Sequence, residues 1–226
     1  MSTMTRFKKS KTSGTAMGCL GVLEKTTDLG AIKGRKVMVL LDEQNLSITA
    51  RDLGYELKYG LLARRIREAA ESAQLHLFTA SDPDGRNTRK KFEVLGYVTH
   101  VKTIRRRPLP DGGQRSDCNI DNLFAFWAGL LAVDNGWDVM VLASGDYGLS
   151  GELAEAICRR DANKSTKLMT LSLPGSTAQD LDAQKNPNIT ANLEIGLDLL
   201  KPANRSTRCF VARALGNNVF HSHKLY

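Results

Sequence analysis

Residues 36–46 read KVMVLLDEQNL, and this stretch decides how the rest of the chain is interpreted. Its first six residues form a short apolar run rich in branched side chains, which is typical of a strand buried on both faces of a parallel sheet. The run ends at Asp42, a residue type that favours the start of a helix. A second run, DVMVLA at 138–143, leads into the tripeptide SGD at 144–146. The two runs predict two buried strands, each followed by an aspartate.

Strand and helix patterns alternate around these two runs. Apolar side chains at spacings of three and four residues predict an amphipathic helix over 59–70. Further strands are expected at 75–80, 97–102 and 167–173, and further helices at 87–95, 120–135 and 151–160. This alternation implies parallel strands, right-handed crossovers and helices on both faces of the sheet. We therefore expect an α/β fold, a three-layer α/β/α sandwich with a mainly parallel sheet. Prolines and glycines predict a loop at 105–116, RRRPLPDGGQRS.

The positive charge is concentrated near the amino terminus. The chain has 226 residues and a formal net charge of +8, and residues 1–36 hold eight basic and two acidic side chains. Residues 1–34 are rich in Lys, Ser, Thr and Gly without periodicity, which predicts a flexible basic arm. We expect the folded domain to cover 35–203 and a carboxyl-terminal extension to cover 204–226.

Composition excludes several classes of protein. No apolar run approaches the roughly 18 residues that a membrane span needs, so we expect no membrane association. The cysteines are far apart and form no CxxC pair, which argues against a structural zinc site and is typical of a reducing compartment. We therefore expect a cytoplasmic protein. The four cysteines are Cys19, Cys118, Cys158 and Cys209.

Three enzyme classes lack their motifs. The residues after the first strand, LLDEQNLS, contain no glycine, so the dinucleotide-binding fingerprint is absent. No GxSxG motif is present, and none of the four histidines lies in a hydrolase pattern. A phosphotransfer site of the DxD type would need a second acid where Gln44 stands.

Three aspartates stand at expected strand or helix ends. Asp42 and Asp146 follow the two buried strands, and Asp121 opens the helix in CNIDNLFAFW. The carboxyl ends of parallel strands lie at one edge of a sheet, so these side chains are expected to converge. Crowded carboxylates need a cation to offset their repulsion, and oxygen ligands favour Mg²⁺ or Mn²⁺. Each of these residues also has a purely structural explanation when it is considered alone, because aspartate commonly caps helices. The same holds for Asn45, whose side chain is of a type that closes turns.

These residues resemble the NYN-domain family, PIN-like metal-dependent ribonucleases. The shared features are Asp-x-x-Asn from Asp42 to Asn45, the Gly-Tyr pair at 96–97, the helix-opening Asp121 and the Ser-Gly-Asp at 144–146. The resemblance covers about 37–200 and implies a PIN-like, Rossmannoid fold and hydrolysis of RNA.

The resemblance also implies the site. Asp42, Asp121 and Asp146 would hold Mg²⁺ or Mn²⁺, with Asp117 as a rival for the Asp121 role because it stands one helical turn earlier. Asn45 would orient water or phosphate. The family usually places a second acid where this chain has Gly148. The alternative is therefore an RNA-binding or scaffold protein that keeps the NYN fold with weak or no activity.

RNA has to approach the acidic site over a basic rim. The residues expected to contact RNA are Ser144, Arg86, Arg89, Lys90, Lys91, Lys102, Arg105, Arg106 and Arg107. The alternative for the charged ones is a solvated surface without nucleic-acid function. In the basic arm, Lys8, Lys9 and Lys11 are expected to bind either phosphates or an acidic partner protein.

Overall fold

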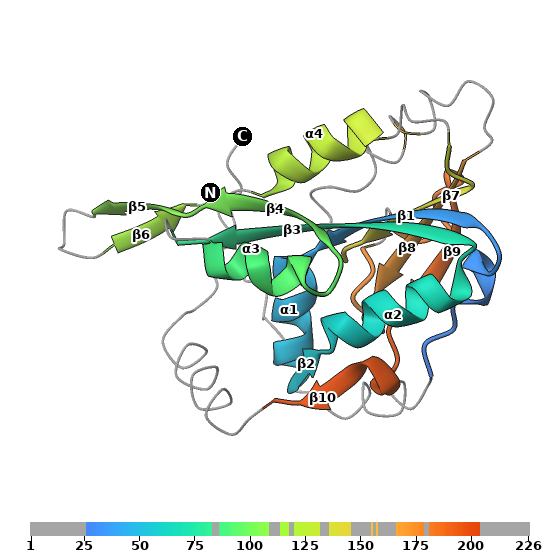
Figure 1. Ribbon diagram of the computed structural model, residues 1–226, viewed down its shortest axis with the longest axis horizontal. Helices are drawn as coiled ribbons and strands as arrows, with labels where there is room; N and C mark the ends of the chain where they lie inside the picture. Colours follow the sequence, from blue (N-terminus) through green and yellow to red (C-terminus); the bar gives the residue numbers. More distant parts are fainter. Residues whose placement is uncertain are drawn as a thin grey trace, which may run out of the picture.

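The computed structural model describes residues 26–82, 86–108, 114–117, 120–131, 136–145, 155, 157, 166–178 and 181–203. Its centre is a six-stranded sheet in the order β4-β3-β1-β7-β8-β9, in which every neighbouring pair is parallel (Figure 1). The strands are Lys36–Asp42 (β1), Ser72–Ser81 (β3), Val98–Thr103 (β4), Val139–Ala143 (β7), Lys167–Ser172 (β8) and Ile189–Glu194 (β9).

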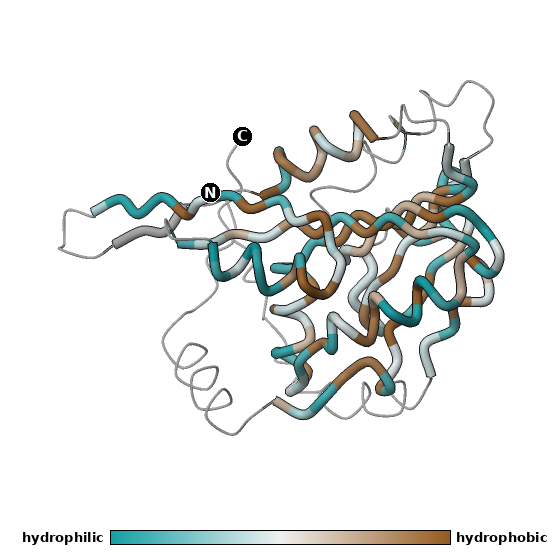
Figure 2. The backbone as a smooth tube through the Cα atoms, in the orientation of Figure 1, coloured by the Kyte–Doolittle hydropathy of each residue, from teal (hydrophilic) through white to brown (hydrophobic). Residues whose placement is uncertain are grey.

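Helices cover both faces of this sheet. The helices are Glu43–Asp52 (α1), Tyr59–Ala69 (α2), Arg86–Glu93 (α3) and Asp121–Leu131 (α4). In β1, Val37, Val39 and Leu41 share one hydrophobic cluster with α1, α2 and α3, whereas Met38 and Leu40 share another with α4. This alternation follows from the two-residue period of a strand. Figure 2 shows the hydrophobic residues along the central strands and the hydrophilic ones on α3 and β5. The expected three-layer α/β/α sandwich is confirmed.

The strand order defines one special position in the sheet. The chain moves from β1 outward to β3 and β4, then returns through α4 to β7 on the other side of β1. In open α/β sheets, ligands bind outside the carboxyl ends of the strands at the point where the order reverses. That point lies here between β1 and β7, the two strands that end next to the predicted aspartates.

Several elements were not expected from the sequence. These are α1, β9 and a small antiparallel sheet made of Tyr55–Leu57 (β2) and Leu200–Pro202 (β10). The helix expected over 151–160 lies mostly outside the described residues, but residues 155 and 157 are helical, and Ile157 is buried in the same cluster as α4. No helix in the described ranges is long and apolar enough to cross a membrane.

The prediction of a loop at 105–116 is wrong. Arg105–Pro108 (β5) and Gln114–Asp117 (β6) form an antiparallel two-stranded sheet. β5 follows β4 after a single residue, so the hairpin prolongs the edge of the central sheet (Figure 1). Pro108 is the last residue of β5, where proline is tolerated at a strand end, and residues 109–113 lie outside the described residues.

The expected boundary of the flexible arm at residue 34 is also wrong. A short 3-10 helix, Gly30–Ile32 (η1), precedes β1, and Thr27, Leu29 and Ile32 are buried. Leu29 and Ile32 belong to the cluster beneath α1 and α2. The described part of the domain therefore starts at residue 26, and residues 1–25 and 204–226 lie outside the described residues.

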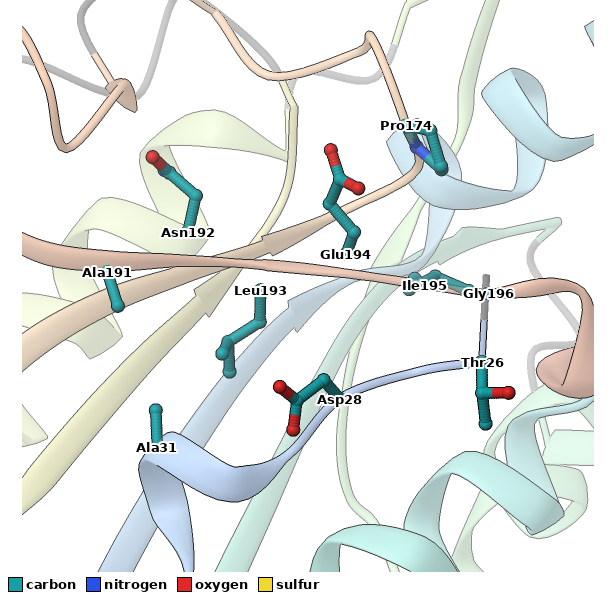
Figure 3. A pocket seen from close by; sticks show the side chains of 10 residues that line it. All are labelled: Thr26, Asp28, Ala31, Pro174, Ala191, Asn192, Leu193, Glu194, Ile195 and Gly196. Atoms are coloured by element: carbon teal, nitrogen blue, oxygen red, sulfur yellow. The ribbon is translucent and has the colours of Figure 1, made fainter. Parts of the chain in front are cut away.

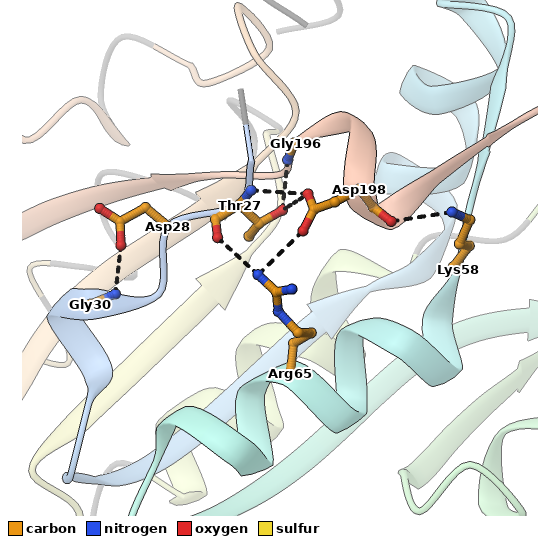
Figure 4. A network of polar contacts seen from close by, with 7 residues as sticks. All are labelled: Thr27, Asp28, Gly30, Lys58, Arg65, Gly196 and Asp198. Carbon is orange, nitrogen blue, oxygen red and sulfur yellow. Dashed lines mark hydrogen bonds and ion pairs between the residues drawn. The ribbon is translucent and has the colours of Figure 1, made fainter. Parts of the chain in front are cut away.

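A cluster of polar contacts joins this amino-terminal segment to Asp198, near the carboxyl-terminal end of the described domain (Figure 4). The Asp198 carboxylate accepts hydrogen bonds from the Thr27 backbone N–H at 2.9 Å and from the Thr27 hydroxyl at 2.8 Å. The Arg65 guanidinium lies 3.3 Å from the same carboxylate. Burial acts to raise the pKa of Asp198, but the Thr27 hydrogen bonds and Arg65 outweigh it and lower that pKa. These contacts join segments 171 residues apart in the sequence.

Candidate functional site

Asp42 lies at the carboxyl end of β1 and begins the site. It is buried, with 5% of its surface exposed. The residue has an extended backbone and caps α1, because its Oδ1 atom accepts a hydrogen bond from the Asn45 backbone N–H at 3.1 Å. A carboxylate at this position also interacts favourably with the helix dipole. Asp42 is therefore a helix cap, as expected from its residue type, and this cap fixes the orientation of its second carboxylate oxygen.

Two hydrogen bonds connect this strand end to the end of β7. The Ser144 hydroxyl donates to Asp42 Oδ2 at 3.4 Å, and the Gly145 backbone N–H donates to Asn45 Oδ1 at 2.8 Å. The Asp-x-x-Asn motif and the Ser-Gly pair, 100 residues apart in the chain, thus meet at the reversal point of the sheet. Asp146 is the next residue after this pair, and it lies outside the described residues.

The backbone at Gly145 is closely packed. A Cβ atom at this position would lie 2.3 Å from the Ser176 carbonyl oxygen, so any other residue type would force the backbone to move. Ser176 is itself held by its hydroxyl, which donates to the Leu173 carbonyl at 2.7 Å. The turn after β8 therefore fixes the backbone at Gly145, the last described residue after β7.

Asp121 is the first residue of α4 and is partly buried. One turn later, the Phe124 ring packs against Phe78 with 4.8 Å between centroids, and Phe78 is the register partner of Asp42. Asp121 therefore starts its helix on the side of the sheet where β1 ends.

The argument for Asp117 as an alternative ligand is wrong, because residue 117 belongs to β6 and is paired with Arg105 rather than standing one helical turn before Asp121. Among the residues that the structure describes, no three His, Cys, Asp or Glu side chains are close enough together to hold a metal ion. The predicted ligand set includes Asp146, so it extends beyond that part of the chain.

Sequence reasoning did not single out Glu43, although it stands beside Asp42 in the quoted stretch. The Glu43 carboxylate accepts hydrogen bonds from the Thr79 hydroxyl at 3.0 Å and the Tyr59 hydroxyl at 3.4 Å. Burial, followed by the charge of Glu43, raises the pKa of Tyr59, so its hydroxyl stays protonated and can donate. Glu43 therefore turns toward β3, whereas Asp42 contacts the end of β7.

The predicted basic residues lie on α3, β4 and β5. All of them are exposed except Lys102, which is half-buried on β4. Arg106 forms a 2.6 Å ion pair with Asp82, a residue that follows β3. The α3 group begins with Arg86 at the end of the sheet where β3 finishes, and the β5 group continues from β4 at the same end (Figure 1).

Two histidines lie between β3, β4 and α4 and serve packing. His76 Nδ1 and His100 Nε2 are 2.9 Å apart, and the His100 ring stacks on Phe78 at 4.5 Å and contacts Trp127. Burial, with smaller contributions from His76 and Arg89, lowers the pKa of His100 to about 4. Burial also lowers the pKa of His76. Both rings are neutral at pH 7.

A cavity of about 380 Å³ lies elsewhere, between the amino-terminal segment and the edge strand β9 (Figure 3). Figure 3 shows Asp28 and Ala31 facing Leu193 and Ala191 across it, with Glu194 on the other side of the strand. None of the predicted site residues lines this cavity, and β7 and β8 separate it from β1. It is not the site at the reversal point.

Comparison with known proteins agrees with this geometry. The profile of the NYN domain family matches residues 36–192, from the first residue of β1 into β9. The chain belongs to the NYN domain family. The resemblance inferred from the sequence motifs is therefore confirmed, and the fold is the nuclease-like fold of that family.

A solved structure shares the fold of this NYN domain. It is the crystal structure of a protein of unknown function, VPA0982, from Vibrio parahaemolyticus RIMD 2210633. The two are 22% identical with a TM-score of 0.57, and the similarity covers 74% of this chain and 97% of that one. No curated protein matches the sequence.

Proposed function

We propose that this NYN domain is a metal-dependent ribonuclease that hydrolyses RNA phosphodiester bonds between the ends of β1 and β7. One observation carries the proposal. The Asp-x-x-Asn motif and the Ser-Gly pair meet there through the bonds from Ser144 to Asp42 and from Gly145 to Asn45. Membership of a nuclease-like family supports the same conclusion.

Asp42 contributes the type of ligand that a hard divalent cation requires. The Asp42 carboxylate is buried at the reversal point of the sheet, and carboxylate oxygens are the ligands that Mg²⁺ and Mn²⁺ prefer. We propose that Asp42, Asp121 and Asp146 hold the ion. When bound, a divalent cation lowers the pKa of a coordinated water and offsets negative charge on the phosphate.

Asn45 holds the ends of β1 and β7 together. Its amide oxygen accepts the Gly145 N–H, so the side chain braces the two strand ends and directs its NH₂ group elsewhere. We propose that this NH₂ group donates to a phosphate oxygen or a water. The cap from the Asn45 N–H to Asp42 holds the carboxylate in one orientation, which reduces the reorganisation needed when charge develops during the reaction.

The experiment that tests this function is RNA cleavage by the full chain with Mg²⁺ or Mn²⁺, compared with the same reaction in EDTA. Asp146→Asn keeps the shape of the side chain but removes its charge, so we expect cleavage to fall by at least about a hundredfold. Asp52→Asn is the matched control, because this exposed aspartate lies at the opposite end of α1 from Asp42. The control is expected to cleave like the wild type.

Cleavage in EDTA at the full rate would refute the metal dependence, and full activity of Asp146→Asn would refute the site. Gly148 gives the alternative its support, since it stands where the family usually has a second acid. A wild-type chain that binds RNA in every assay and cleaves none would establish the alternative, an RNA-binding or scaffold protein.

A further inference from the structure

We propose that the hairpin β5–β6 holds the RNA backbone beside the site, so that the enzyme prefers RNA that extends several nucleotides past the cleaved bond. This inference rests on the proposed function, and it adds a substrate class to it. The preferred substrate is a strand long enough to reach from the end of β1 to the outer part of β5.

The hairpin is placed at the correct end of the sheet for this role. β4 is separated from β1 by β3 alone, and β5 follows β4 after one residue. Figure 1 shows β5 and β6 projecting from the sheet beyond the carboxyl end of β4. This is the same end at which Asp42 and Ser144 lie. A strand of RNA bound between β1 and β7 can therefore continue across β3 and along the hairpin.

Charge favours a polyanion on this hairpin. Arg105, Arg106 and Arg107 are consecutive and exposed in β5. Side chains in a strand alternate between faces, so Arg105 and Arg107 share one face of β5. Their neighbour Arg106 forms the ion pair with Asp82 at 2.6 Å, which connects β5 to the segment that follows β3.

The composition of the hairpin adds a second observation. The two strands together hold four arginines and one aspartate, a net charge of +3. Neither strand contains an aromatic residue, since β5 reads RRRP and β6 reads QRSD. The hairpin therefore suits contact with phosphates, which is independent of sequence, rather than base stacking.

The distance from the site sets the length of RNA required. Asp42 is in register with Phe78, and Phe78 with His100, so β4 lies two strand spacings, about 10 Å, from β1. Arg107 lies seven residues beyond His100, about 23 Å along an extended strand, which places it about 25 Å from Asp42. A stacked strand rises about 3.4 Å per nucleotide, so the hairpin is reached about seven nucleotides from the site.

The test compares the full chain with a hairpin variant, Arg105→Gln with Arg107→Gln. Arg106 is kept because it forms the ion pair with Asp82. The matched control, Lys33→Gln with Lys167→Gln, removes the same charge from two exposed lysines near the starts of β1 and β8, at the opposite end of the sheet. Thermal melting first establishes that all three proteins are folded.

Cleavage is measured on RNA oligonucleotides from about 4 to about 20 nucleotides long, with the same labelled end. For the wild type and the control, we expect kcat/KM to rise at least about tenfold as the strand becomes long enough to reach the hairpin. For the hairpin variant, we expect the ratio of kcat/KM on long RNA to kcat/KM on short RNA to fall close to one. Equal preference in all three proteins would overturn the inference and leave the ribonuclease function standing.

Binding of a long RNA in EDTA gives an independent readout. Each phosphate contact on a single strand contributes about 0.7 to the slope of log K against log salt, so losing two contacts makes the slope shallower by about 1.4. The control should keep the wild-type slope. A hairpin variant and a control with the same slope would show that only net charge matters, and would overturn the inference. A wild-type chain that neither binds nor cleaves any RNA would overturn the proposed function together with it.

Discussion

The pair of neutral histidines beneath α4 predicts that acid destabilises the fold in a defined pH range. The unfolded chain takes up a proton at an ordinary histidine pKa near 6.5, whereas His100 in the folded protein stays neutral until about pH 4. Between these values the unfolded state binds more protons, so stability falls as the pH falls. His76 acts in the same direction, and its buried Nε2 atom has no hydrogen-bond partner among the described residues to receive a new proton.

The size of the effect follows from the two pKa values of His100. Linkage between pKa values of about 6.5 and 4 gives about 2 kcal/mol of lost stability at pH 5 relative to pH 7.5. Because the His100 ring is only partly buried, solvent screening reduces this to about 1 kcal/mol.

His100→Gln tests this reasoning, since an amide can still hydrogen-bond His76 Nδ1 but does not titrate. The free energy of unfolding is measured by urea denaturation of both proteins at about pH 7.5 and about pH 5. The wild type should lose about 1 kcal/mol more than His100→Gln on acidification, because the carboxylates contribute equally to both. Equal losses in the two proteins would refute the assignment of His100 as a buried neutral ring.

Three further predictions concern the site and the amino-terminal segment. Asp42→Asn should leave the metal-free protein as stable as the wild type or slightly more stable, because Asn also caps helices, while the rise in Tm on adding Mn²⁺ should disappear. Deleting 2–25 should hardly change the unfolding free energy, whereas deleting 2–34 should cost at least about 3 kcal/mol, since two fully buried aliphatic side chains are lost. Gly145→Ala should lower the unfolding free energy by about 1 to 3 kcal/mol, because the added Cβ displaces the backbone from Ser176. The same variant should cleave RNA more slowly, and its Tm is measured in parallel to establish that it is folded.

The elements that sequence reasoning predicted correctly have local signals of their own. β7 is apolar throughout, β1 is apolar between Lys36 and Asp42, and α2 has a regular spacing of buried side chains. By contrast, α1 buries only Leu46 and Ala50, and its third apolar residue, Ile48, is exposed, so periodicity does not mark the helix. The local signal of α1 is the Asp42 cap, and an aspartate at this position fits a helix cap and a metal ligand equally well.

Other elements depend on distant partners. In β9, the Asn192 side chain donates to the Thr170 hydroxyl and to the Leu181 carbonyl, two partners that no local sequence pattern indicates. The segment before β1 is fixed by Asp198, far away in the sequence. A local reading of glycines and lysines therefore favours a flexible arm, although Leu29 is buried. The hairpin likewise continues from β4, and the Arg106–Asp82 ion pair joins it to the segment after β3.

The topology explains why the candidate residues come from such distant parts of the sequence. Reversal of the strand order places β7 beside β1, so the residues that follow each strand are neighbours although about 100 positions separate them. The chain reaches β7 only through α4, which runs back over the sheet and therefore begins, at Asp121, on the side where the strands end. A two-residue strand period then turns Asp42 to the same face as Phe78, the face that α4 covers. Glu43, one residue later, turns to β3 instead. A site built from Asp42 and the residues that open α4 and follow β7 is thus a consequence of strand order, whereas the cavity at β9 lies two strands away from it.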